Sequence, residues 1–303
     1  MIYTIKTGKN ASDLDHSSSR SRCRNRGRSL HFVEVSRSTY AKKSLGQNFL
    51  VDQNYIDKII QAVDPSSDDT VIEIGPGRGA ITEQLVGSGA NVLAVELDRA
   101  LVPVLREKFS HATNFTIVEA DATEIDFATL INTSLKFEIS ELKTKVVANL
   151  PYYISTAILQ KLSDQRECFL SLVLMFQREV VDRITAEPGN SERGFLTVLV
   201  ESAFTVEKLF DVPPNAFRPQ PKVWSSVVRL TPKENVITHP EEFRKLLSAA
   251  FGQKRKTILN NLKYAYANAE DQLRNAGIDP QRRAETLTLV EWQTLLDAMR
   301  PSN

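Results

Sequence analysis

The stretch Asn149-Leu150-Pro151-Tyr152 combines residue types that can hold a planar amine. It follows a short apolar run at residues 145–148, a pattern that predicts a strand ending in a loop. Asn149 offers an amide carbonyl as acceptor, and the carbonyls of Leu150 and Pro151 are further candidate acceptors. Pro151 also removes a competing N–H, and Tyr152 offers a flat face for a base. The four residues indicate an amine or amide substrate, but an ordinary strand that ends in a proline turn has the same pattern.

A glycine-rich turn at residues 73–79 lies between a predicted strand and a predicted helix. Gly75 and Gly77 would let a ligand approach the backbone closely, and a helix N-terminus favours an anionic group. Glu96 ends the next predicted strand, where a carboxylate can accept hydrogen bonds from both ribose hydroxyls. Asp121 ends the third strand, where it can accept from an adenine amine. Together these residues predict an adenosine-containing ligand.

Two such ligands fit the glycine-rich turn, namely NAD and S-adenosylmethionine. Gly75, Gly77 and Ala80 satisfy the loose dinucleotide pattern G-x-G-x-x-G/A. A dehydrogenase would also need a hydride-transfer partner beyond the fourth strand, and no evident arrangement of His, Lys or Tyr follows it. Residues 149–152 stand there instead and suit amine methylation. We therefore predict S-adenosylmethionine as the cofactor.

The order of the predicted elements places these residues at one edge of a sheet. Strands alternate with helices from residue 70 to about 230, which predicts an α/β fold with a parallel, doubly wound sheet that binds ligands at its carboxyl edge. Beyond residue 235 the pattern is helical only, at 243–251, 254–264, 269–276 and 289–299. We predict a Rossmann-like domain at 40–235 and a small all-helical domain at 236–303.

The composition is that of a globular protein. The chain has 303 residues, of which 42% are hydrophobic, and no apolar run long enough to span a bilayer. Cys23 and Cys168 fit neither a disulfide framework nor a metal-ligand spacing, and the four histidines are scattered. We therefore expect a cytoplasmic protein with no metal, and a monomer because nothing in the sequence indicates an oligomer.

Residues 1–39 differ from the remainder of the chain because they are rich in Ser and Arg and of low complexity. We favour a disordered tail or a start codon placed too far upstream. An RNA-binding arm and an organelle transit peptide are the alternatives, and Asp13 and Asp15 weaken the latter. Residues 44–303 carry 28 basic and 34 acidic side chains, so a nucleic-acid site there would depend on local basic patches.

The motifs together resemble those of the ribosomal RNA adenine N6,N6-dimethyltransferases, which include the bacterial kasugamycin-sensitivity enzymes and the eukaryotic dimethyladenosine transferases. They occur in the same order, at residues 46–50, 73–79, 149–152, 216–223, 253–257 and 282–287. The resemblance runs from about Lys42 to the C-terminus and leaves residues 1–39 outside it. It implies a Rossmann-like class I methyltransferase domain followed by a helical domain that contacts the substrate RNA.

The resemblance also implies a site and a reaction. The cofactor would be lined by Asn48, Leu50, Gly75, Glu96, Asp121 and Asn149. The reaction would add two methyl groups to each of two adjacent adenosines in a hairpin loop near the 3′ end of small-subunit rRNA, within a pre-ribosomal small subunit.

Other residues are candidates for holding the RNA. We expect Tyr152 to stack on one face of the adenine and Phe217 on the other, although Phe217 is equally placed to be a core aromatic that anchors its loop. We expect phosphate contacts from Lys42, Lys43, Arg218, Lys222, Lys254, Arg255 and Lys256.

Three other functions remain open at this point. The nearest is an erythromycin-resistance type methyltransferase of large-subunit rRNA, but residues 213–217 and 281–286 look more like the small-subunit enzymes. The second is a non-catalytic ribosome assembly factor or a relative of mitochondrial transcription factors, and the intact residues 149–152 favour retained catalysis. The third is the NAD-dependent dehydrogenase, disfavoured above.

Overall fold

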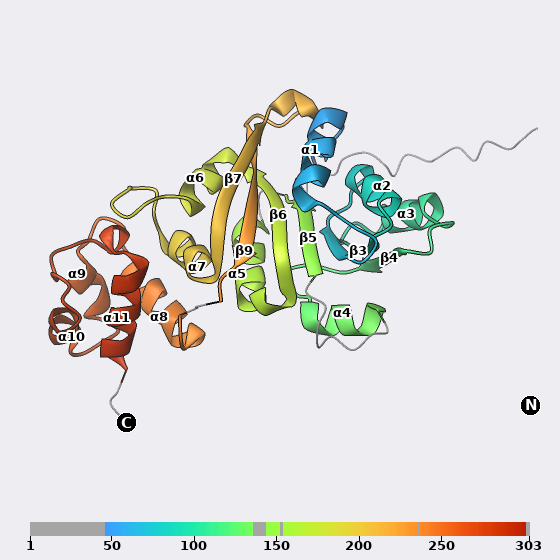
Figure 1. The fold of residues 1–303 in the computed structure, drawn as a ribbon. Coiled ribbons are helices and arrows are strands. Elements are labelled where there is room, and N and C mark those ends of the chain that lie inside the picture. The colour runs from blue at the N-terminus through green and yellow to red at the C-terminus, as the bar shows by residue number, and fades with distance from the viewer. Residues whose placement is uncertain (1–45, 136–143, 152–153, 235–236, 301–303) are drawn as a thin grey trace, which may run out of the picture. The chain divides into compact units, whose positions relative to one another are not determined.

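Seven of the described strands form one sheet in the spatial order β4-β3-β2-β5-β6-β9-β7 (Figure 1). The computed structural model describes residues 46–135, 144–151, 154–234 and 237–300. The strands are β2 (Thr70–Ile74), β3 (Asn91–Glu96), β4 (Phe115–Glu119), β5 (Thr144–Asn149), β6 (Phe169–Gln177), β7 (Phe204–Val212) and β9 (Ser225–Pro232). Neighbours from β4 to β6 are parallel, and β9 pairs antiparallel with β6 and β7. The predicted α/β fold with a mainly parallel sheet is confirmed.

Helices cover both faces of this sheet because its strands carry apolar side chains in both directions. The helices are α1 (Gln53–Val63), α2 (Ala80–Gly87), α3 (Val102–Lys108), α4 (Phe127–Leu135), α5 (Ser155–Asp164), α6 (Arg178–Ile184) and α7 (Phe195–Ala203). Val71 packs in one cluster with side chains of α1 and α2, and Ile72, which points to the other face, packs with α4 to α7. No helix within the described ranges is long and apolar enough to cross a bilayer.

Strand order reverses between β2 and β5, since β3 and β4 lie on one side and β6 on the other. Loops that follow β2 and β5 therefore diverge at the carboxyl edge and leave a crevice between them, where ligands bind in sheets of this kind. The glycine-rich turn follows β2, and Asn149 ends β5. The topology thus brings the two sequence patterns to the same crevice.

Two short strands form a separate antiparallel pair, β1 (Phe49–Leu50) and β8 (Phe217–Arg218). Leu50 lies opposite Phe217, and the Val51 and Asp52 N–H groups both donate to the Ala216 carbonyl at 2.9 and 3.3 Å. The pair ties the start of the described chain to a loop that follows β7. Neither strand was predicted, because a two-residue strand has too few side chains to show a period.

The C-terminal region is helical, with α8 (Pro240–Ala250), α9 (Ile258–Leu262), α10 (Ala269–Asn275) and α11 (Leu289–Met299) (Figure 1). Single 3-10 turns occur at Arg166–Cys168, Pro214–Ala216 and Ala284–Thr286. The helices share a core around the fully buried Trp292, and this core also includes Val198 and Leu199 of α7. A capping box formed by Thr288 and Glu291 begins α11.

The prediction of a helix over residues 254–264 is wrong, because only Ile258–Leu262 is helical. The Asn261 side chain accepts from the Gln253 N–H at 3.0 Å and donates to the Gln253 carbonyl at 3.2 Å. These bonds hold residues 253–256 in a loop, and the Thr257 side chain caps the helix that follows.

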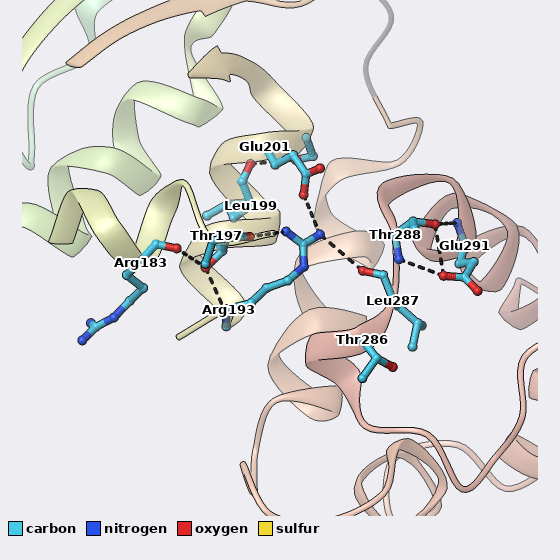
Figure 2. Close-up of polar contacts among 12 residues, drawn as sticks. Arg183, Arg193, Thr197, Leu199, Glu201, Thr286, Leu287, Thr288 and Glu291 are labelled. Carbon is cyan, nitrogen blue, oxygen red and sulfur yellow. Dashed lines mark hydrogen bonds and ion pairs between the residues drawn. The ribbon is translucent and has the colours of Figure 1, made fainter. Parts of the chain in front are cut away.

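A buried arginine links the loop before α7 to the C-terminal helices (Figure 2). Arg193 is 2% exposed, and its Nη1 donates to the Ala186 carbonyl at 3.0 Å. Its Nη2 donates to Glu201 Oε2 of α7 at 2.6 Å and to the Leu287 carbonyl at 3.3 Å. Leu287 directly precedes the N-cap of α11, so one guanidinium ties three segments together.

Replacement of Arg193 should therefore destabilise the protein. We expect Arg193→Ala to lower the free energy of unfolding by about 2 kcal/mol, because the Glu201 carboxylate and two carbonyls lose a buried donor. Partial exposure of Glu201, 32% for its side chain, limits the loss. Urea unfolding followed by circular dichroism measures it.

Arg274→Ala is the matched control, since Arg274 pairs with Glu270 on an exposed helix face. That pair should contribute no more than about 0.5 kcal/mol. Equal losses in the two variants would contradict the linking role of Arg193.

Candidate active site

A cavity opens at the carboxyl edge of the sheet, and the residues predicted at successive strand ends meet there. Gly75 and Gly77 line it after β2, Glu96 at the end of β3, Asp121 after β4 and Asn149 at the end of β5. The wall also includes Asn48, Leu150, Pro151 and Phe217 from the predicted set, together with apolar residues of the strand ends. Six chain segments far apart in sequence therefore share one cavity.

The glycine-rich turn has a backbone that only glycine adopts easily. Gly75, Gly77 and Gly79 have φ angles of +70°, +58° and +76°. A Cβ atom at Gly77 would lie 2.9 Å from Cδ1 of Phe49, so the ring occupies the space of a side chain. The Arg78 guanidinium in turn lies 4.6 Å from the centroid of that ring. The turn is thus packed against β1 while its inner side faces the cavity.

Glu96 is a buried carboxylate held by backbone N–H groups. It is 6% exposed, its Oε2 accepts from Gly77 N at 3.1 Å, and its Oε1 accepts from Asp98 N at 2.8 Å. Burial raises the pKa of Glu96, and these two hydrogen bonds oppose that rise. Each oxygen retains a lone pair, so the carboxylate can still accept from two hydroxyls of a ligand.

Asp121 uses one oxygen to shape its own loop. Its Oδ1 accepts from the N–H and the hydroxyl of Thr123 at 2.8 and 2.7 Å. No donor from the described residues reaches Oδ2. That oxygen can accept from an exocyclic amine of a ligand in the cavity.

The side-chain amide of Asn149 is oriented by the segment that precedes β1. Its Nδ2 donates to the backbone carbonyl of Asn48 at 3.1 Å, and Asn48 Nδ2 donates to the Gly46 carbonyl at 3.1 Å. Because the amide nitrogen is bound in this way, Oδ1 is the part of the side chain that remains as an acceptor. Gln47 fixes the same segment from its other side by donating to Asp98 Oδ2 at 3.0 Å.

The two other candidate acceptors, the carbonyls of Pro151 and Leu150, differ in whether a backbone N–H already donates to them. The Pro151 carbonyl accepts from Ile154 N at 3.3 Å, whereas no donor from the described residues reaches the Leu150 carbonyl. Leu150 itself is fixed, because its N–H donates to the Met175 carbonyl at 3.3 Å. The Leu150 carbonyl is therefore the better second acceptor. Tyr152 lies outside the described residues.

Comparison with known proteins gives the family. Residues 38–300 match the family model of the ribosomal RNA adenine dimethylases. The chain belongs to this family. The resemblance seen in the sequence is thus confirmed.

The relatives in this family are similar over most of their length. The ribosomal RNA small subunit methyltransferase A of Hahella chejuensis is 43% identical over 260 residues, which are 85% of this chain and 92% of that protein. The protein of the same name from Geobacter metallireducens is 44% identical over 267 residues, or 86% and 95% of the two chains.

Solved structures agree on the fold. A dimethyladenosine transferase from Plasmodium falciparum superposes with a TM-score of 0.68 at 29% identity, over 82% of this chain and 95% of that chain. The 23S rRNA methyltransferase ErmE superposes with a TM-score of 0.62 at 25% identity, over 83% and 99%.

Two of the predicted site residues of this dimethylase, Leu50 and Phe217, are core residues that offer little or no surface to the cavity. Leu50 is not among the lining residues, since its side chain is 4% exposed and packs in the core with Val147, so it supports the site through its pairing with β8. Phe217 lines the cavity, but it is 1% exposed and belongs to the same core. Its burial favours the anchoring role over stacking on a base.

Glu73 was not predicted as a functional residue, and it does not line the cavity but directly precedes the strand end that does. Glu73 is the penultimate residue of β2 and is 2% exposed, and the Thr82 hydroxyl of α2 donates to its Oε2 at 2.6 Å. Burial, together with the charge of Glu96, raises the pKa of Glu73 to about 7. An acid among the apolar residues of a buried strand is the signal that would have found it.

Gly77→Ala should weaken cofactor binding. A methyl group there is strained at φ +58° and collides with the Phe49 ring, so the turn or the ring must shift, and a shift of the turn disturbs the hydrogen bond from Gly77 N to Glu96. We expect at least about a 10-fold loss in affinity for S-adenosylmethionine, on the order of 1.4 kcal/mol, by isothermal titration calorimetry.

Gly277→Ala is the control for backbone strain alone, because Gly277 has φ +72° and no atom within 4 Å of a Cβ. Its cofactor affinity should equal that of the wild type. An unchanged affinity in Gly77→Ala would show that the turn does not contact the cofactor.

Glu73→Gln should alter the dependence of stability on pH. Because the folded-state pKa of about 7 exceeds the ordinary value of 4.5, the contribution of this carboxyl is fully present below pH 4.5 and is lost as the pH rises through 7. Relative to the variant, the wild type should lose on the order of 3 kcal/mol between pH 4.5 and pH 8.

Urea unfolding at a series of pH values measures that difference. Glu83→Gln, an exposed substitution in the same α2 helix, is the control for removal of one carboxylate. Parallel stability profiles for wild type and Glu73→Gln would mean that Glu73 ionises normally in the folded protein.

Proposed function

We propose that this chain transfers methyl groups from S-adenosylmethionine to the N6 amines of two adjacent adenosines in the 3′-terminal hairpin loop of small-subunit rRNA. The observation that carries the proposal is the position of the Asn149 amide, oriented by Asn48 and set beside the glycine-rich turn in one cavity. Family membership supports the reaction, and the relatives named as small-subunit methyltransferases support the substrate.

The residues of the cavity fit the proposed cofactor. Glu96 would accept from the ribose hydroxyls, and the free oxygen of Asp121 would accept from the adenine amine. Because Gly75 has no side chain, the space beside the backbone carbonyl of Asn149 stays open. A Cβ at Gly75 would lie 3.9 Å from that oxygen. When bound, S-adenosylmethionine supplies a methyl group that is already activated by the sulfonium charge.

The protein then has to prepare the amine. The nitrogen N6 of adenine is a weak nucleophile, because its lone pair is delocalised into the ring. Asn149 Oδ1 and the Leu150 carbonyl would accept its two N–H groups, which favours a tetrahedral nitrogen with the lone pair directed at the methyl group. Positioning and local electrostatics are the main contributions of the protein.

No strong general base is required, because the amine becomes far more acidic as it is alkylated. Water or one of the carbonyls can take the proton. After the first methylation a single N–H remains, so the second transfer needs room for one methyl group and retains one acceptor contact. The Leu150 carbonyl is the contact that can be given up, since Asn149 is fixed by Asn48.

The domain division is part of the same proposal. Residues 40–235 would bind the cofactor and the target base, and residues 236–303 would contact the RNA. The helical core around Trp292 supports a separate packing unit, although α7 contributes to it. The exposed Lys254, Arg255 and Lys256 precede α9 and would bind phosphates of rRNA within a pre-ribosomal small subunit. We propose that the protein acts as a monomer.

The large-subunit reaction is the second candidate. Similarity to the 23S rRNA methyltransferase ErmE favours it, at 25% identity. The small-subunit relatives are 40–44% identical, which gives the small subunit the stronger support. Methylation assays on isolated small and large subunits, followed by mapping of the modified base, separate the two.

Asn149→Ala should nearly abolish methyl transfer while leaving cofactor binding measurable. Loss of the oriented acceptor removes an interaction that strengthens as the amine develops charge, so kcat should fall about 100-fold or more. Transfer of labelled methyl groups to unmodified small subunits measures it, with calorimetry for the cofactor.

The control is Asn132→Ala, which removes an exposed amide in α4. It should match the wild type in both assays. Undiminished turnover by Asn149→Ala would refute the mechanism, and absence of turnover by the wild type on small subunits would refute the proposed substrate.

A further inference from the structure

The loop between β8 and β9 exposes an aromatic side chain at the edge of the sheet where the cavity opens. Trp224 is 43% exposed and the adjacent Val223 is 40% exposed, although both are apolar. The loop begins next to Phe217, which lines the cavity, and ends at Ser225, the first residue of β9. One segment of eight residues thus runs from the cavity wall to the exposed indole.

The register of the sheet locates Trp224 relative to Asn149. On β6, Met175 lies opposite Asn149 of β5, and the N–H of Arg178, three residues further on, donates to the Trp224 carbonyl at 2.9 Å. Trp224 therefore lies at the same edge of the sheet as Asn149. It is roughly 10 Å further along the strand direction and two strand spacings, about 10 Å, to the side.

Three positive side chains belong to the segments that adjoin Trp224 in the chain or through its backbone hydrogen bond. Arg178, Arg218 and Lys222 are all exposed, and the Arg218 guanidinium is held by the carbonyls of Asn215 and Phe217 at 3.0 and 2.8 Å. The nearby acids are Glu179, which is exposed, and Asp211, whose charge is already paired with Lys208 at 2.9 Å. A flat aromatic face among cations is the arrangement that binds unpaired nucleotides.

We propose that Trp224, with Val223 beside it, is a stacking platform for an unpaired base of the RNA, a few nucleotides from the adenine held at Asn149. This role rests on the proposed function, because it supplies the RNA whose base would stack. The cations Arg178, Arg218 and Lys222 would hold the phosphates on either side of that base. Trp224 would act on binding and register of the substrate, and not on the methyl transfer itself.

Tryptophan fluorescence tests the contact directly. The chain has two tryptophans, and Trp292 is fully buried, so an RNA ligand can quench Trp224 only. We expect an RNA hairpin with adenosines in its loop to quench the emission, and a fully paired duplex of the same composition not to. In Trp224→Phe the quenching should disappear. Quenching that persists in Trp224→Phe, or no quenching in the wild type, would overturn the proposal.

Substitution separates stacking from a structural role. Trp224→Ala should raise the Kd for the hairpin and the KM for small subunits about 10-fold, with kcat and cofactor affinity unchanged. Trp224→Phe, which keeps an aromatic face, should restore most of the affinity. Leu170→Ala is the matched control, because Leu170 is 47% exposed near the opposite end of β6, and it should behave as the wild type.

Two results of these affinity measurements would also overturn the platform. The first is hairpin affinity in Trp224→Ala equal to that of the wild type, which would leave the exposed patch to another kind of partner. The second is equal weakness of the Ala and Phe variants, which would show that the face of the ring does not matter. Failure of the wild type to methylate small subunits would refute the proposed function instead, and fluorescence quenching by the hairpin would still be measurable.

Discussion

The hydrogen bond from Asn149 Nδ2 to the Asn48 carbonyl is the contact on which the candidate site depends most. It decides which end of the amide faces a substrate, and it joins the end of β5 to a segment 101 residues earlier. That segment is held in turn by the pairing of β1 with β8. A change in the loop around Phe217 would therefore reach Asn149 through backbone pairing, even though the two residues are 68 positions apart.

Two buried carboxylates, Glu96 and Glu73, hold the glycine-rich turn and the helix that follows it. Glu96 binds the Gly77 N–H, and Glu73 binds the Thr82 hydroxyl in the helix that the turn begins. Burial, together with the charge of Glu96, raises the pKa of Glu73, so an ionised Glu73 is costly in the folded protein. The same burial that makes Glu96 a directed acceptor makes the protein sensitive to pH.

The proposed RNA-binding surface and the proposed cofactor site differ in the exposure of their side chains and in how those side chains are held. Around the proposed cofactor site, polar groups are held by hydrogen bonds, as in the buried Glu96 and the half-buried Asn149. Around the rim, Trp224 and the neighbouring cations are exposed and face solvent. Pre-organised acceptors suit a reaction that needs orientation, whereas exposed rings and cations suit a large, flexible substrate that must bind and leave.

The sequence by itself determined the strand–helix alternation, the acids at successive strand ends and the family, because these depend on local periodicity and on short motifs. It could not show that Pro151 already uses its carbonyl, that Phe217 is packed in the core, or that residues 253–256 form a loop, since each depends on contacts with distant or competing groups. The orientation of Asn149 and the raised pKa of Glu73 likewise arise only when separate segments meet. Tertiary structure decides them because hydrogen-bond partners and desolvation are properties of the packed protein.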